Sequence, residues 1–242
     1  MPLSFILPST EGSFCTLVEN LAGALPWSPI VLSLKVAGLA TACSFCAGLG
    51  AAWLLARRRS SVTALLDALC TLPMILPPTV LGYYLILLVG RRGLAGAWLA
   101  ELGINLIFSW QGAVVAATVV VFPLIYKSAR AALESVDERL EDAARTLGAS
   151  EWKVFARISL PLAWRGIAAG SMLAFARGMG EFGATLMIAG NIPGKTQTLA
   201  LAIYDAFQAG NDEQATGLVV VTSCLCLGIL VAADRIFGGR RT

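Results

Sequence analysis

The 242-residue chain carries too little charge to cover a compact body in water. Hydrophobic residues make up 57% of it and charged residues only 14%, whereas about a quarter of a soluble domain is charged. We therefore expect an integral membrane protein. The absence of histidine excludes catalytic sites with a histidine base, and the net charge of +3 is too small to indicate a nucleic-acid partner.

Five segments are apolar and long enough to cross a membrane as helices, which takes about 20 such residues. They cover about residues 29–56, 65–89, 106–126, 162–189 and 216–233. Residues 1–28 contain three prolines and two glutamates and lack the basic start of a signal peptide. We expect them to form an outer or interfacial segment, or part of an extra helix, and residues 29–242 to form one all-α membrane domain.

Basic residues predict the orientation of these segments, because they are retained on the cytoplasmic side of a membrane. With the N-terminus outside, thirteen of the eighteen Lys and Arg residues fall inside, three fall outside and two lie within spans. The N-terminus is therefore expected outside the cell and the C-terminus in the cytoplasm. The hydrophilic loop of residues 127–161 is then cytoplasmic.

Three prolines interrupt the second segment, and each removes a backbone donor and clashes with the preceding turn. They are Pro73, Pro77 and Pro78. Carbonyl groups freed in lipid need other partners, so a helix broken here is expected to face protein or a polar pathway. Pro77 and Pro78 are candidates for lining a translocation path, and ordinary helix packing is the alternative explanation.

The loop of residues 127–161 has the pattern of two helices joined by a turn. Apolar residues recur at the spacing of a helix with one hydrophobic face, namely Leu133, Val136, Leu140, Ala143, Ala144 and Leu147. Gly148 is a typical helix stop, and a second helix is expected over residues 151–158. Lying against the inner membrane face, this pair could present apolar surface to a groove on a partner.

The loop also contains a spaced motif made of Asp142, Ala143, Ala144, Gly148, Ile158, Leu160 and Pro161. These residues and their spacing resemble the EAA loop of ABC importer membrane subunits. The resemblance implies a coupling helix that docks in a cleft of a separate ATPase subunit. Because Glu141 precedes Asp142 at the acidic position, the family role falls to one of these two carboxylates, and the spacing does not choose between them.

From about residue 29 to its end, the chain is similar to the family of molybdate ABC-transporter permeases. The stretches that carry this similarity are LPPTVLGYY at 76–84, GRRG at 90–93, VDERLEDAARTLGAS at 136–150 and ARGMGEFGAT at 176–185. The similarity implies the type I ABC importer permease fold in the bacterial inner membrane. Sulfate permeases share the loop, so sulfate and tungstate stay open as substrates.

The family resemblance also implies the partners. Two copies of this chain would form a homodimer, bind two ATPase subunits and receive substrate from an extracytoplasmic molybdate-binding protein. ATP and Mg²⁺ would bind to the ATPase, so no catalytic residue, cofactor or metal site is expected on this chain. Small residues allow close helix contact, and the two copies are expected to pair through faces that contain Gly38, Ala42, Gly48, Gly50, Gly166, Gly170 and Gly178.

Two charged residues lie within the fourth segment. Arg177 and Glu181, spaced i and i+4, share one helical face. Charges at bilayer depth cost at least about 2.5 kcal/mol each, so the two residues either neutralise each other as an internal ion pair or serve a function. The functional interpretation places Arg177 beside an aqueous path, where its charge helps an oxyanion to pass.

Other function classes have weaker support. An ion-coupled transporter using Arg177 and Glu181 would be expected to show inverted repeats, and none is seen. Residues 189–196 are close to a P-loop, but the orientation places them outside the cell, so we expect a loop leading to a short helix over 199–208. The glycines at 178, 180 and 183 match a dinucleotide fingerprint within a membrane span, where no such fold exists.

Overall fold

The structure, a computed structural model, describes residues 27–58, 60–90, 93, 96–103 and 105–237. The predicted segment 1–28 lies almost entirely outside these residues, as do Arg91 and Arg92 of the GRRG stretch. Every regular element of the described part of the chain is helical, which confirms the prediction of an all-α fold.

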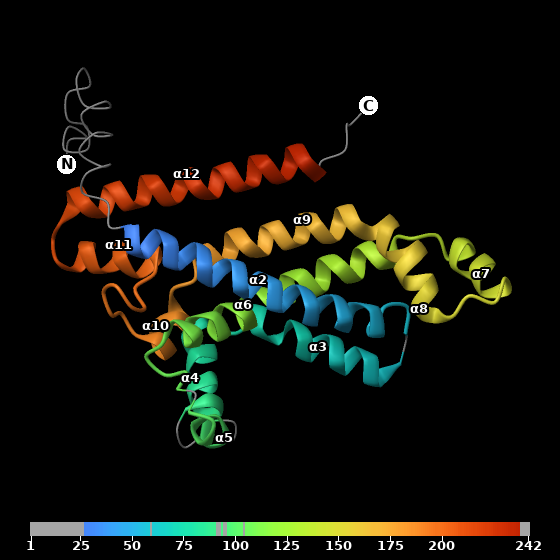
Figure 1. Cartoon of the computed structure of the whole chain (residues 1–242), viewed down its shortest axis with the longest axis horizontal. Coiled ribbons are helices and arrows are strands. Elements are labelled where there is room, and N and C mark those ends of the chain that lie inside the picture. The colour runs from blue at the N-terminus through green and yellow to red at the C-terminus, as the bar shows by residue number, and fades with distance from the viewer. Residues whose placement is uncertain (1–26, 59, 91–92, 94–95, 104, 238–242) are drawn as a thin grey trace.

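Four long helices run side by side and give the molecule its length (Figure 1). They are α2 (Trp27–Leu55), α6 (Trp110–Glu134), α9 (Leu160–Met179) and α12 (Asp212–Phe237). By length and composition the described residues contain four helices able to cross a membrane, or five if one bent pair counts as a single span.

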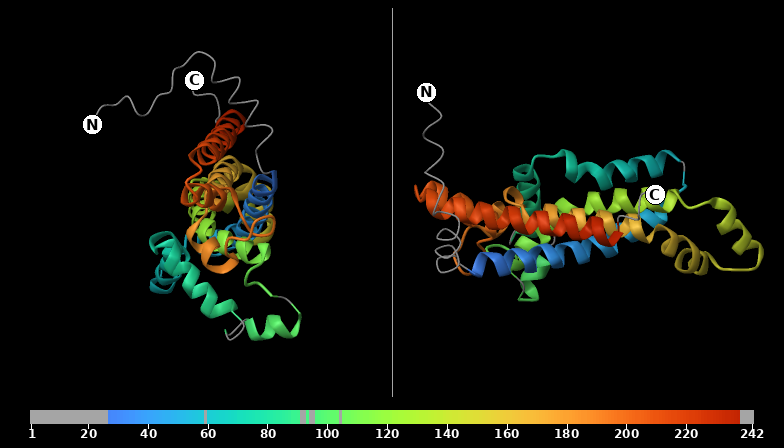
Figure 2. Two further views of the ribbon diagram at one scale, coloured as in Figure 1. Left: turned by 90° about the vertical axis from the view of Figure 1, so that its left-hand side faces the viewer. Right: turned by 90° about the horizontal axis from the view of Figure 1, so that it is seen from above.

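The bent pair comprises α3 (Ser61–Ile75) and α4 (Pro78–Val89), which meet at an angle of 114°. The break falls at Pro77 and Pro78 rather than at Pro73, which α3 accommodates. Leu76 is extended because a following proline disfavours helical backbone. α4 and the short α5 (Gly96–Glu101) consequently point away from the long helices (Figure 2).

The predicted segment 162–189 is likewise two helices. α9 ends at Met179, and α10 (Gly183–Ala189) starts after a short break. The loop of residues 190–198 then leads into α11 (Leu199–Gln208), where the sequence predicts a short helix, and this prediction is confirmed.

Small residues bring α9 against α6. A Cβ atom at Gly166 would lie 2.8 Å from the Cβ of Ala132, and one at Gly170 would overlap the side chain of Ser128. Gly48 on α2 similarly lies against the backbone of Tyr126. Gly48, Gly166 and Gly170 therefore pack helices within one chain, whereas Gly50 faces open space.

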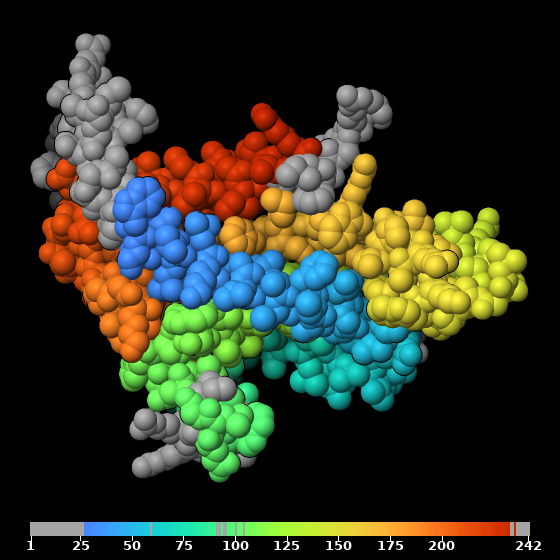
Figure 3. All heavy atoms as spheres, viewed as in Figure 1, coloured from blue at the N-terminus to red at the C-terminus, as the bar shows by residue number. Residues whose placement is uncertain are grey.

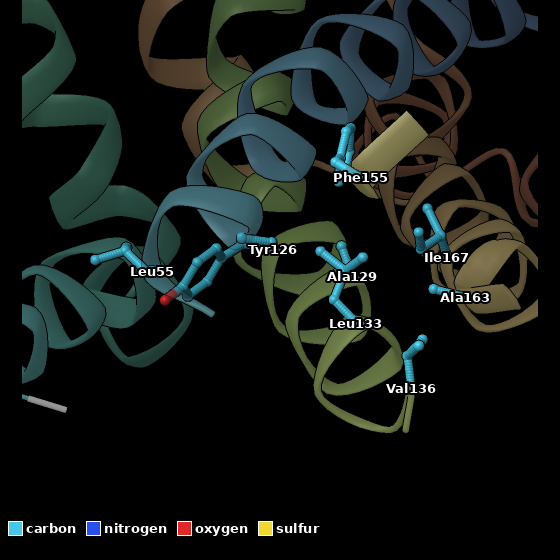
Figure 4. Packing of buried hydrophobic residues seen from close by; sticks show 9 residues of the cluster. Leu55, Tyr126, Ala129, Leu133, Val136, Phe155, Ala163 and Ile167 are labelled. Carbon is cyan, nitrogen blue, oxygen red and sulfur yellow. The ribbon is translucent and has the colours of Figure 1, made fainter. Parts of the chain in front are cut away.

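One apolar cluster lies where the bundle meets the loop of residues 127–161. Figure 4 shows its side chains, which come from α2, α6, α9 and the loop. Its members are Ala52, Leu55, Tyr126, Ala129, Leu133, Val136, Phe155, Ala163 and Ile167. This packing fixes the ends of three long helices at the point from which the loop projects (Figure 3).

Candidate functional site

The loop of residues 127–161 lies at the end of the bundle opposite α11, on the right of Figure 1. α6 extends into it as far as Glu134, and α7 (Glu138–Thr146) starts after a break. The interpretation of residues 133–147 as one amphipathic helix is therefore wrong. The break arises because Asp137 caps a new helix, its carboxylate accepting a hydrogen bond of 3.0 Å from the N–H of Arg139.

Gly148 ends α7 as predicted. Its φ of +80° is left-handed, a conformation that glycine adopts without steric cost. The N–H of Gly148 donates to the carbonyl of Arg145, and the N–H of Ala149 donates to that of Ala144, each at 3.0 Å. These bonds close the end of the helix and turn the chain toward α8 (Glu151–Val154).

The two neighbouring carboxylates of α7 point in opposite directions. Glu141 is buried, at 6% exposure, and is the only buried residue of α7. Its Oε1 accepts a hydrogen bond of 2.7 Å from the hydroxyl of Ser159. The side chain of Asp142 is instead 69% exposed. Glu141 therefore attaches the loop to the bundle, whereas Asp142, which is bonded to Arg145, lies on the exposed surface.

Arg57, just beyond α2, is the nearer of two basic partners of Glu141, the other being Arg145 on α7 itself. Its Nη1 donates a hydrogen bond of 2.8 Å to Oε2 of Glu141, and its Nη2 donates to the backbone carbonyl of Val136. Arg57 has φ of +62°, which is unusual for a residue with a side chain. In the sequence this residue is one of three arginines at the end of a span, and nothing there identifies its partner.

Arg145 joins α7 to α8 across the turn at Gly148. It donates hydrogen bonds to Glu151 at 2.8 Å and to Asp142 at 2.7 Å. These bonds, that to Glu151 first, raise the pKa of Arg145 above its ordinary value. Arg145 therefore stays charged at physiological pH and holds the two helices together.

The exposed surface of α7 and the turn after it is partly apolar. Leu147 is 88% exposed and Leu140 is about half exposed, whereas Trp152 on α8, also exposed, packs edge-on against Trp53 of α2. Ala143 also lies at the surface, and Ala144 is half-buried. Large apolar side chains gathered on a projecting element indicate a contact with another protein.

The I-x-L-P stretch joins the loop to the membrane part of the chain. Residues Phe155–Ser159 form a π-helical turn, η2, in which the N–H of Leu160 donates to the carbonyl of Phe155. Pro161, which has no N–H to donate, follows directly after this π-helical turn, in the continuous helical stretch from α8 into α9. Ile158 and Leu160 are half-buried, and Pro161 is exposed.

The candidates for the translocation path form a second group, remote from the loop. Arg177 and Glu181 lie 3.0 Å apart, Nη1 to Oε2, with side chains 40% and 2% exposed. Oε1 of Glu181 accepts from the N–H of Ala184 and so caps α10, whereas the buried Oε2 has no partner with hydrogen-bond geometry among the described residues.

The two helix breaks meet, which the sequence does not predict. A Cβ atom at Gly183, the first residue of α10, would lie 2.8 Å from the Cβ of Pro78, the first residue of α4. One turn further along α4, a Cβ atom at Gly82 would lie 2.6 Å from the Cβ of Met187. Pro77 and Pro78 are therefore brought next to the break that contains Glu181.

A cluster around Asp67 was missed from the sequence. Its carboxylate accepts hydrogen bonds from Tyr126 at 2.7 Å, Lys127 at 2.9 Å and Arg130 at 2.7 Å. Because α3 has no buried residue, this carboxylate is its main polar attachment to α6. An acidic residue inside an apolar segment is the signal that could have revealed the cluster.

Residues 189–196 do not have the setting of a P-loop. They follow helix α10, whereas a P-loop follows a strand. The glycines at 178, 180 and 183 likewise lie at the junction of α9 and α10 and follow no strand.

Comparison with protein families identifies the class of the chain. Residues 45–238 match the family described as binding-protein-dependent transport system inner membrane component. This match covers most of the chain, which therefore belongs to that family. A multispanning component of an inner-membrane transport system agrees with the apolar helices described above.

Individual relatives narrow the comparison. The chain is 47% identical to the molybdenum transport system permease protein ModB of Escherichia coli K12, covering 86% of this chain and 92% of that protein. It is 44% identical to ModB of Haemophilus influenzae, covering 86% of this chain and 91% of that protein. A sulfate transport system permease protein, CysW of Synechocystis, is 38% identical, covering 77% of this chain and 68% of that protein.

Solved structures show the fold. The chain resembles a MetNI methionine ABC transporter with a TM-score of 0.68 and 20% identity, covering 95% of this chain and 98% of that one. It also resembles a bacterial alginate ABC transporter, determined with a periplasmic protein bound to alginate pentasaccharide, with a TM-score of 0.71 and 17% identity, over 93% and 81%. The predicted type I ABC importer permease fold is thus confirmed.

Proposed function

We propose that this chain is the membrane subunit of an ATP-driven importer of molybdate. The observation that carries the proposal is a projecting helical loop with exposed apolar residues, on a chain 47% identical to a molybdenum permease over most of its length. The carboxylate of Glu141 on α7 attaches the loop to the bundle. The exposed surface of α7 would bind the ATPase subunit.

The coupling surface in this proposal consists of the exposed residues Leu140, Asp142, Ala143 and Leu147, which would dock in a cleft of an ATPase subunit that binds ATP and Mg²⁺. Gly148 sets the turn that presents this surface. Ile158, Leu160 and Pro161 join it to α9, so a displacement of the docked helix would move the membrane helices. Glu141, with Ala144 beside it, faces the bundle.

The translocation path in this proposal passes the junction of α4 and α10. The partly exposed positive charge of Arg177 would attract a doubly charged oxyanion. The buried carboxylate of Glu181 would weaken this attraction, because it neutralises part of that charge. A weak site suits transport, because a conducting site must also release its ion. Pro77 and Pro78 supply irregular backbone at the same place, as is typical of transport pathways.

A second copy of the chain would complete the path. The apolar face of α3 and α4 is exposed in the single chain, with Leu69, Ile75, Tyr83 and Leu87 each more than half exposed. In this arrangement five spans from each copy cross the inner membrane, with residues 1–28 outside. The loop of residues 127–161 lies in the cytoplasm, and the opposite end receives molybdate from a binding protein.

Reconstituted uptake tests this function. The chain is purified with an ATPase subunit and a molybdate-binding protein of an ABC importer from the same organism, and the complex is placed in lipid vesicles that contain Mg-ATP. We expect radiolabelled molybdate to accumulate only with ATP inside and binding protein outside. Unlabelled tungstate and sulfate, added in excess, measure the selectivity. Uptake driven by a proton gradient without the ATPase would contradict the proposal, and preferential uptake of sulfate would correct the substrate.

A further inference from the structure

The projecting helix α7 has very little buried attachment to the rest of the chain. Glu141 is its only buried residue, and Figure 1 shows α7 at the extreme end of the molecule. A force applied to α7 therefore passes through the contacts of this buried side chain, through the exposed bonds of Arg145 to Glu151 on α8, or along the backbone at either end of the helix.

Arg57 joins Glu141 to two long helices. It lies just beyond the end of α2, and besides Glu141 its guanidinium reaches the carbonyls of Leu133 and Val136 at the end of α6. Carbonyl groups at a helix C-terminus lack partners within the helix and attract positive charge. A single planar group thus connects the ends of α2 and α6 with α7.

Ser159 completes the connection on the other side of the carboxylate. Its hydroxyl donates to Glu141 at 2.7 Å from the π-helical turn that leads directly into α9. The two oxygens of Glu141 therefore have different partners: Oε1 is bound by Ser159, and Oε2 is bound by Arg57 at 2.8 Å and by Arg145, within α7 itself, at 3.4 Å. Three membrane helices are tied to the coupling helix through one buried carboxylate.

We propose that Arg57 is a positioning residue for coupling, which transmits the displacement of α7 to α2 and α6 through Glu141. This inference rests on the proposed function and adds a residue outside the loop itself. The left-handed backbone conformation of Arg57 is strained, and the hydrogen bonds of its side chain stabilise it. Because a guanidinium makes several directed hydrogen bonds at once, lysine is not an adequate substitute.

The test uses the full complex in lipid vesicles and measures three quantities: the amount of ATPase that copurifies, the rate of ATP hydrolysis, and the molybdate taken up per ATP. For Arg57→Met we expect copurification and hydrolysis to persist. Uptake per ATP is expected to fall by about tenfold or more, because Glu141 would keep only Arg145, at 3.4 Å, as a basic partner and would lose its connection to α2 and α6. Arg57→Lys, which keeps the charge, is expected to show a smaller loss.

Glu138→Gln is the matched control. Glu138 also lies near Arg57, at 3.7 Å, but its side chain is 72% exposed. We expect uptake per ATP to stay within about twofold of the unmodified complex, as for most surface substitutions. Normal uptake per ATP in Arg57→Met would overturn the inference, and so would loss of the ATPase from both Arg57 variants. If the unmodified complex itself failed to couple hydrolysis to uptake, the proposed function would be at fault instead.

Discussion

Replacing Gly148 with valine is expected to abolish uptake while the chain still inserts into the membrane. The φ of +80° is costly for any residue with a Cβ, by about 1–2 kcal/mol, and more so for a β-branched one. The turn would then relax and shift α7 relative to α8. Uptake into vesicles and the amount of chain in the membrane fraction are the measurements.

The surroundings of Gly148 make this prediction specific to backbone conformation. A Cβ atom built there would meet nothing within 4 Å, so a steric clash does not contribute. Gly148→Asn is the matched control, because asparagine tolerates left-handed backbone far better than valine does. We expect Gly148→Asn to retain much of the uptake. Equal activity of the valine and asparagine variants would contradict the assigned role of the turn.

Replacing Gly170 with leucine is expected to prevent stable assembly of the bundle. A Cβ atom there already overlaps the side chain of Ser128 on α6, and a leucine would force α6 and α9 apart. Overpacking of this kind costs about 1–3 kcal/mol or more, and close contact between small residues is a main source of helix association in membranes. The melting temperature of the detergent-solubilised chain and its yield are the measurements.

Gly228→Leu is the control for the Gly170 variant, because Gly228 on α12 has open space where a Cβ would be. It should melt near the temperature of the unmodified chain. A second experiment identifies the contact itself: Ser128→Gly should restore part of the stability lost in Gly170→Ala. If Gly170→Leu were as stable as Gly228→Leu, the packing of α6 on α9 described above would be wrong.

Much of the fold follows from constraints that act on local sequence. Lipid requires long apolar helices, so hydropathy locates α2, α6, α9 and α12. Proline cannot donate a backbone hydrogen bond, and the break before α4 falls at Pro77 and Pro78, two of the three prolines predicted to interrupt this segment. The break between α9 and α10 contains no proline and was predicted only as an interruption of a single span.

The site was only partly predictable, because its residues come together from distant parts of the chain. The spacing of residues identified the loop and the helix stop at Gly148. It could not show which of the adjacent acidic residues Glu141 and Asp142 is buried. Their different orientations depend on Arg57 and Ser159, which are 84 and 18 residues away from Glu141. The helix break before Asp137 also separates two residues that were predicted to share one apolar face. Leu133 is buried, whereas Leu140 is about half exposed.

The orientation of the loop tests the central claim most directly, since an ATPase can act only from the cytoplasm. A cysteine at the exposed position Ser150 and another at Lys195, near the opposite end, are introduced separately into a Cys15→Ser background. The other native cysteines lie in candidate membrane helices. With a membrane-impermeant thiol reagent, we expect intact cells to label position 195, and position 150 to react only after permeabilisation. Labelling of position 150 in intact cells, with position 195 protected, would contradict the account.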